Sequence, residues 1–342
     1  MEQNSLTQFF DSIFYVVAEP FYYLFSVEQR VYWLYLAMAA VLAAWVFIHL
    51  PPKFVDKSSG TKQSRLVLFF NFCFPKKVYF HKSARVDYLF FLINRIAFPW
   101  LIAPLMIGAM AMSNLSKSLW AGVPLLPGLL GEADTSDKIF FTLVLLIAMD
   151  GAIYLAHYLQ HHVAPLWEFH KVHHSAEVLT PVTVYRMHPI DDLLTGSIAG
   201  ITMGLIIGLF QTLYQEGISW YVVGSLNVGL LAFYLLGYNL RHSHIWLSYN
   251  PKISHIFISP AQHQIHHSSH PTHFSKNLGF IFAFWDWIFG TLYVPIKHET
   301  IRYGVANENP DKFNAIWKLY LLPFWEIGNS LKSIRRKSRI DQ

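Results

Sequence analysis

Charged residues and cysteine are both scarce in this sequence. Only 14% of its 342 residues are charged, whereas 54% are hydrophobic and 17% are aromatic. Because soluble domains carry about 25% charged residues, this composition indicates an integral membrane protein. The single cysteine, Cys73, excludes an internal disulfide, a zinc ribbon and an iron–sulfur cluster held by cysteines. If a metal is bound, histidine must bind it.

Several targeting and electron-carrier motifs are also missing. The N-terminus lacks the basic start, short apolar core and small-residue cleavage site of a secretory signal, so we expect no segment to be removed. There is no C-x-x-C-H haem motif, no H-P-G-G pair of a fused cytochrome b5 domain and no G-x-G-x-x-G dinucleotide motif. Any electrons that a reaction needs must therefore come from a separate protein.

The net charge of +5 is modest, and the basic residues gather in two segments, 53–85 and 332–339. This distribution indicates orientation against a membrane surface, and we expect no nucleic-acid partner. Residues 6–26 combine many aromatic side chains with Asp11, Glu19 and Pro20, which predicts an interfacial helix.

Apolar stretches of about the length that crosses a bilayer recur along the chain. They lie at about 31–50, 89–112, 139–158, 193–214 and 218–240. By the positive-inside rule, the basic loop and the basic tail lie in the cytoplasm. The later stretches form an out-and-back hairpin, which would return the chain to the same face. We therefore expect an all-α, polytopic membrane helical bundle of about 4–6 spans with a cytoplasmic histidine-rich helical cap.

The predicted division of the chain has three parts. An N-terminal membrane region, 1–137, contains the interfacial helix, the spans at 31–50 and 89–112 and a basic cytoplasmic loop at 51–86. A catalytic domain follows at 138–295, and a basic cytoplasmic C-terminal tail at 296–342.

The histidines are concentrated and regularly spaced. Fifteen of the 18 lie between His157 and His273. His157 and His161 are separated by four residues, and two boxes, His170–His174 and His263–His267, share the pattern H-x-x-H-H. On a helix, positions i, i+3 and i+4 are neighbours on one face, so several imidazoles can converge on one or two metal ions. Imidazole suits iron, zinc, copper and nickel.

These motifs resemble the membrane fatty acid hydroxylase / sterol desaturase superfamily. The resemblance covers about Asp150 to Tyr293, and it consists of H-Y-L-Q-H-H, P-L-W-E-F-H-K-V-H-H-S, R-M-H-P-I-D-D, H-Q-I-H-H, N-L-G and W-D-W-I-F-G-T in this order. It implies a centre of two iron ions, although zinc is possible in the isolated protein, with O2 as co-substrate. It also implies attack on an unactivated C–H bond of a membrane lipid.

The resemblance also implies a ligand set. The positions that match are His157, His161, His170, His173, His174, His242, His263, His266 and His267, and less surely His162 and His188. A ligating imidazole usually donates its other N–H to a carboxylate or carbonyl. Asp150, Asp286 and Asn239 are candidates for such support, and Asp286 stands in the W-D pair that the family keeps.

The leading prediction is an O2-dependent oxidoreductase that hydroxylates or desaturates a sterol, a fatty acyl chain or a related lipid. A separate donor, cytochrome b5-like or a ferredoxin, would supply electrons at the basic cytoplasmic face. The alternatives are a histidine-ligated zinc enzyme on the same scaffold and a metal transporter. The absence of a fused cytochrome domain favours a bacterial inner membrane over the endoplasmic reticulum. The ligands alone do not separate hydroxylation from desaturation.

Overall fold

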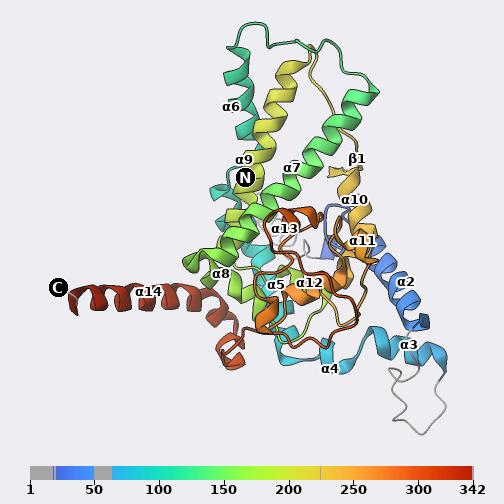
Figure 1. The fold of residues 1–342 in the computed structure, drawn as a ribbon, viewed down its shortest axis with the longest axis vertical. Helices are drawn as coiled ribbons and strands as arrows, with labels where there is room; N and C mark the ends of the chain where they lie inside the picture. The colour runs from blue at the N-terminus through green and yellow to red at the C-terminus, as the bar shows by residue number, and fades with distance from the viewer. Residues whose placement is uncertain (1–17, 19–20, 50–63, 224, 341–342) are drawn as a thin grey trace, which may run out of the picture. The chain divides into compact units, whose positions relative to one another are not determined.

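The computed structural model describes residues 18, 21–49, 64–223 and 225–340. Apart from helices, the regular elements of this part of the chain are one pair of two-residue strands, β1 (Val222–Val223) and β2 (Leu226–Asn227), in which Val222 faces Asn227 in antiparallel register (Figure 1). The all-α class is therefore confirmed. By their contacts the residues divide into two units: unit 1 comprises 1–45, 91–152 and 196–239, and unit 2 comprises 46–90, 153–195 and 240–342.

The helices follow one another along the chain with short connections. In order they are α2 (Trp33–His49), α3 (Arg65–Cys73), α4 (Lys76–Tyr79), α5 (Lys82–Leu101), η2 (Ala103–Leu105), α6 (Ala109–Ala121), α7 (Thr135–His162), α8 (Ala164–His174), η3 (Pro181–Tyr185), α9 (Pro189–Leu213), α10 (Val228–Leu235), η4 (Tyr238–Leu240), α11 (Pro251–Ser254), α12 (Pro260–His266), η5 (Pro271–His273), α13 (Phe284–Ile288), η6 (Pro310–Phe313) and α14 (Ile316–Ile340).

Fewer helices than expected are long and apolar enough to cross a membrane. Within the described residues, α7 and α9 meet both conditions, and α5 with the η2–α6 segment adds a third if this pair, bent by 45°, is one span. The apolar helix α2 has 17 residues and is about 26 Å long, slightly less than a hydrocarbon core of about 30 Å.

The predicted span at 218–240 is wrong. The β-branched pair Val222–Val223 is extended and pairs with β2, and α10 then begins where the Asn227 side chain accepts a hydrogen bond from the Gly229 N–H. This helix has only eight residues, about 12 Å, so it is too short to cross a bilayer. The return half of the predicted hairpin is therefore not a membrane helix.

A row of glycines on α9 brings it close to α6 within unit 1. Gly196, Gly200, Gly204 and Gly208 recur every four residues, and a Cβ at the last three would lie 2.1–2.5 Å from atoms of the 107–116 segment. The Ser116 hydroxyl donates to the Leu205 carbonyl at 2.8 Å across this contact. Small residues at this spacing let two helix backbones approach, which is a common way of packing helices in lipid.

Unit 2 has its own apolar core and a buried ion pair. Phe90, Val172, Phe313 and Leu319 are buried together. Beside them the Arg186 guanidinium donates to the Asp87 carboxylate at 2.6 Å, to the Ser175 hydroxyl and to two backbone carbonyls. A buried arginine needs this many acceptors, because an unpaired buried charge costs several kcal/mol, about 3–5. Arg186 thereby fixes the end of α8, which carries the first histidine box.

Two predictions fall on residues outside the described part. The interfacial helix at 6–26 and the first half of the basic loop at 51–86 lie mostly among residues 1–17, 19–20 and 50–63, which the structure does not describe. The three-part division at 137 and 295 stays a prediction.

Candidate metal centre

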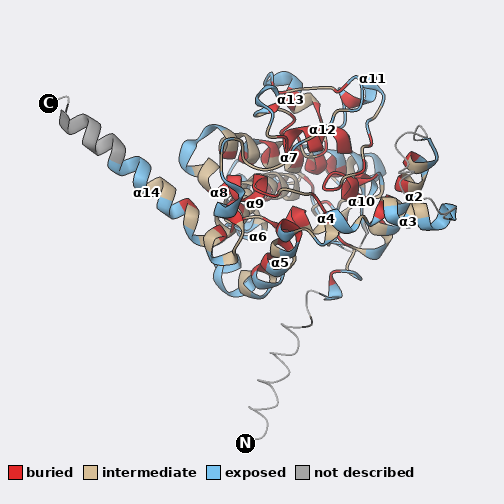
Figure 2. Cartoon of the chain, turned by 90° about the horizontal axis from the view of Figure 1, so that it is seen from below, coloured by how far each residue is buried: buried red, intermediate tan, exposed pale blue. Residues whose placement is uncertain are grey.

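All nine histidines that matched the family motifs most closely belong to unit 2. The last turns of α7 carry His157 and His161, α8 carries the first box, and α12 with its C-cap His267 carries the second box. The α12 helix starts with a reciprocal capping box between Ser259 and Gln262, and almost all of it is buried (Figure 2). These helix ends bring histidines that are far apart in sequence close together.

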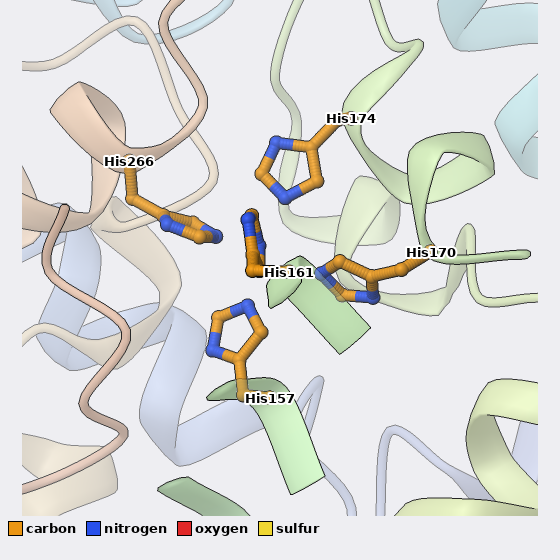
Figure 3. Close-up of side chains that lie close together, drawn as sticks. All are labelled: His157, His161, His170, His174 and His266. Carbon is orange, nitrogen blue, oxygen red and sulfur yellow. The ribbon is translucent and has the colours of Figure 1, made fainter. Parts of the chain in front are cut away.

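The nine histidines form two groups that could each hold a metal ion. The five-histidine group consists of His157, His161, His170, His174 and His266, whose rings face a common point (Figure 3). The four-histidine group consists of His173, His242, His263 and His267. Within each group, one nitrogen per residue lies within 4.8 Å of the others.

The two boxes divide their histidines between the groups in opposite ways. In the first box His170 and His174 join the five-histidine group and His173 joins the other. In the second box His266 alone joins the five-histidine group. Adjacent residues on a helix are about 100° apart, so the two histidines that end each box point to different groups. The boxes are therefore not two halves that each build one site.

The nitrogen spacing fits ligands of a shared ion. In the four-histidine group, the Nε2 atom of His242 lies 3.4 Å from that of His173 and 3.2 Å from that of His263, which lies 3.3 Å from that of His267. Metal–imidazole bonds of about 2.0–2.1 Å in tetrahedral geometry place neighbouring nitrogens about 3.3 Å apart. In the five-histidine group, the buried Nε2 atoms of His161, His174 and His266 have no hydrogen-bond partner in the described part of the chain.

Several rings are held through their other nitrogen. The His157 Nδ1 lies 2.7 Å from the Leu278 carbonyl oxygen, and the His266 Nδ1 lies 3.0 Å from that of Lys276. The His170 Nδ1 lies 3.4 Å from a carboxylate oxygen of Asp191. A carbonyl acceptor requires the proton on Nδ1 and leaves the Nε2 lone pair directed into the group, which is the usual arrangement of metal-binding histidine.

Burial keeps the box histidines neutral. It lowers the pKa of His170, His174, His263, His266 and His267 well below 6.5, and the neighbouring imidazoles lower it further. A metal binds the neutral form of imidazole, so the folded protein presents these histidines in the required protonation state at neutral pH. The residues present fit a histidine-bound pair of metal ions.

His162 and His188 lie outside both groups. The exposed His162 ring stacks on Tyr158 with centroids 3.9 Å apart. His188 is buried, but its Nε2 lies 3.3 Å from the Tyr320 carbonyl oxygen and its Nδ1 accepts from the Ile190 N–H. Both of its nitrogens are therefore engaged, and burial lowers its pKa to about 4.

The predicted supporting residues differ in their positions. Asp150 and Asn239 belong to unit 1, where the Asn239 amide donates to the Arg30 carbonyl. Asp286 lies in unit 2 and accepts from the Leu278 and Gly279 N–H groups at 2.7 and 2.8 Å. It thereby fixes the peptide whose carbonyl faces His157. Sequence patterns could not indicate the supporting carbonyls, because every residue has one.

A cavity of about 410 Å³ opens on the five-histidine group. Three of the histidines, His161, His174 and His266, form part of its wall. The rest of the lining includes both apolar and charged side chains, among them Trp167, Phe274, Val305, Glu168, Lys171 and Glu308. A small molecule can therefore reach this group, whereas the four-histidine group does not contribute to this cavity's described lining.

These features define an all-α membrane protein with a histidine-rich candidate metal centre. Residues 142–291 match the family model described as fatty acid hydroxylase. The resemblance to the fatty acid hydroxylase / sterol desaturase superfamily is thereby confirmed for this part of the chain.

Two relatives of known function are similar over about half of the chain. Ornithine lipid hydroxylase OlsE of Rhizobium tropici is 27% identical over 50% of this chain and 47% of its own length. Alkylglycerol monooxygenase of Danio rerio is 25% identical over 53% of this chain and 37% of its own length. The similarity thus spans less than half of each relative. No solved structure matches the chain.

Proposed function

We propose that this protein is an O2-dependent membrane oxidoreductase that hydroxylates a lipid at a histidine-bound centre of two iron ions. The observation that carries the proposal is the pair of buried histidine groups, each with inward nitrogens at ligand spacing. The family match and the two relatives, whose names denote a lipid hydroxylase and a monooxygenase, support the reaction class. Both groups consist of histidines without a cysteine, and imidazole ligands suit iron.

The chain's own residues hold, orient and shield the centre. The five-histidine and four-histidine groups would each hold one ion, and together the ions supply the activation of O2 for attack on a C–H bond. The Leu278 and Lys276 carbonyls keep the His157 and His266 rings in place, and the Asp191 carboxylate lies 3.4 Å from the His170 Nδ1. The histidines of both boxes are buried, and the cavity opens on three members of the five-histidine group. The balanced reaction is R–H + O2 + 2 electrons + 2 protons to R–OH + water.

The cavity indicates how a lipid would be presented. Trp167, Phe274 and Val305 offer apolar contact, while Lys171 pairs with Glu168 at 2.5 Å and lies 3.9 Å from Glu308. Charged side chains make no favourable contact with an apolar acyl chain, whereas they can bind a polar head group. We therefore favour a lipid oxidised close to its head group over a chain oxidised far from it. This preference is compatible with both relatives' named substrates, an ornithine lipid and an alkylglycerol.

The electrons would come from a separate donor, cytochrome b5-like or a ferredoxin, on the cytoplasmic side. The basic residues of the 64–85 segment and of the tail support this side for unit 2, because basic residues remain cytoplasmic and attract an acidic donor. Turnover that is slowed by salt would be expected from such docking.

The test combines metal analysis with oxygen consumption. The purified protein should contain close to two irons per chain and take up O2 only when lipid and a reductant are present. His266→Ala should remove both properties, whereas the matched control His162→Ala, outside both groups, should keep them. Zinc in place of iron, with lipid turnover under anaerobic conditions, would show a zinc enzyme instead.

A further inference from the structure

Helix α14 carries an exposed apolar stripe. Its members Trp317, Leu321, Phe324, Trp325 and Leu331 are 54–68% exposed. These positions fall within about 120° of the helix circumference, so they form one continuous face. Exposed residues run along most of the described part of the helix (Figure 2). Large apolar residues that form a continuous exposed stripe usually mark a binding surface.

Other residues of α14 are fixed within unit 2. Leu319, on the side opposite the stripe, is fully buried in the core with Phe90, and the Tyr320 ring, beside the stripe, lies 4.9 Å from the Phe90 ring. The helix packs on α8, where the ring of one stripe residue, Phe324, lies 5.1 Å from that of Phe169 although Phe324 is still 54% exposed. The stripe is therefore held in a fixed position relative to the helix that carries the first histidine box.

The charge of α14 complements an anionic partner. Its sequence contains one acidic residue, Glu326, and that carboxylate lies 3.5 Å from the Lys312 ammonium. The same helix sequence contains six basic residues, Lys318, Lys332, Arg335, Arg336, Lys337 and Arg339. An apolar face with tryptophans next to a basic segment is typical of helices that lie in the surface of an anionic membrane. A second copy of this helix would bring the same positive charge and be repelled.

We infer that α14 lies along the surface of an anionic lipid bilayer, with the stripe from Trp317 to Leu331 inserted among the lipid head groups. The positive charge of the helix, known from its sequence, favours a bilayer that contains anionic lipids. This docking fixes α8 at a defined height relative to the lipid surface, because α14 and α8 are packed together. The inferred contact of α14 with the bilayer does not depend on which metal is bound, so it is independent of the proposed reaction.

The experiment uses the full chain in lipid nanodiscs with one fluorescent label. The background is Cys73→Ala, which removes the only cysteine. Cys73 is buried, and burial raises its thiol pKa to about 11, so it is a poor labelling site in any case. The label is placed at Leu321→Cys on the stripe or, as a matched control, at Asn329→Cys, an exposed polar position on the same helix.

Quenchers on lipid chains should quench the label at position 321 several-fold more than that at 329, and aqueous iodide should do the reverse. The lipid effect should be larger with phosphatidylglycerol than with phosphatidylcholine alone. Equal iodide quenching at both positions overturns the inference, and equal lipid quenching in both bilayers overturns the anionic preference. A label at 321 that is shielded from both quenchers, with cross-linking between chains or to residues 1–20, identifies a protein partner and also overturns it.

Discussion

Replacing Asp286 by asparagine tests how the protein holds His157 in position. The buried carboxylate accepts three hydrogen bonds, from the Leu278 N–H, the Gly279 N–H and the Thr291 hydroxyl at 2.7, 2.8 and 2.6 Å. Asparagine has one acceptor oxygen, so its amide group would face one of these donors. The Leu278 peptide, whose carbonyl lies 2.7 Å from the His157 Nδ1, would lose part of its anchor.

The cost follows from these contacts. A buried N–H left without an acceptor costs about 1–3 kcal/mol, and the remaining bonds weaken when the acceptor loses its charge. Burial raises the pKa of Asp286, because the ionised carboxylate is costly to remove from water. Asparagine avoids this desolvation cost, and the saving offsets part of the lost hydrogen-bond energy. We expect a net loss of about 2 kcal/mol in unfolding free energy. Removing the support of a ligand histidine should also lower metal affinity by about 10–100-fold.

The assay measures thermal unfolding in detergent together with metal content under limiting free metal. Asp311→Asn is the matched control, because the Asp311 side chain is 71% exposed and an exposed ion pair such as the one it forms with Lys82 adds little to stability. A variant Asp286→Asn that keeps wild-type metal content and wild-type stability would refute the role of the Leu278 peptide in placing His157.

Two further predictions concern pH and helix packing. Histidines of α8 and α12, such as His170 and His266, have lowered pKa values in the folded chain, so below about pH 6.5 the unfolded chain binds more protons than the folded chain. The metal-free protein should therefore keep its full stability above this pH. As the pH falls further, it should lose up to about 1.4 kcal/mol of unfolding free energy per pH unit for each such histidine. An unfolding temperature that does not decrease between about pH 7 and pH 5 would contradict this. Gly204→Ala places a Cβ 2.5 Å from the Ala109 carbonyl oxygen and should destabilise the protein by about 1–3 kcal/mol. Gly328→Ala, with no atom within 4 Å, should instead stabilise it by up to about 1 kcal/mol in the same unfolding assay, because alanine favours a helix more than glycine does.

Local patterns predicted what depends on local structure. Residue spacing on a helix identified the two boxes, and the composition indicated a helical membrane protein, which the structure bears out. The nine histidines that the structure gathers are those that matched the family motifs most closely, although their role as ligands stays a prediction. The span at 218–240 was wrong because hydropathy does not detect Asn227, which starts a short helix in the middle of the apolar stretch.

Features that depend on tertiary contacts could not be read from the sequence. The division of each box between the groups depends on which other histidines the fold brings beside it, and the spacing within a box does not show this. His188 has the residue type and motif of a ligand, but Tyr320 of the distant helix α14 engages it. The supports of His157 and His266 are backbone carbonyls, which have no sequence signature.

The reciprocal sharing of the two boxes links the two groups thermodynamically. An ion in the five-histidine group would order both α8 and α12, because each helix supplies ligands to it. These helices also carry ligands of the four-histidine group. A second ion would therefore bind to a site that the first ion has already partly ordered, at a smaller cost in conformational entropy. Filling should therefore be cooperative, and the factor by which a first ion raises the affinity for the second must equal the factor by which the second raises the affinity for the first.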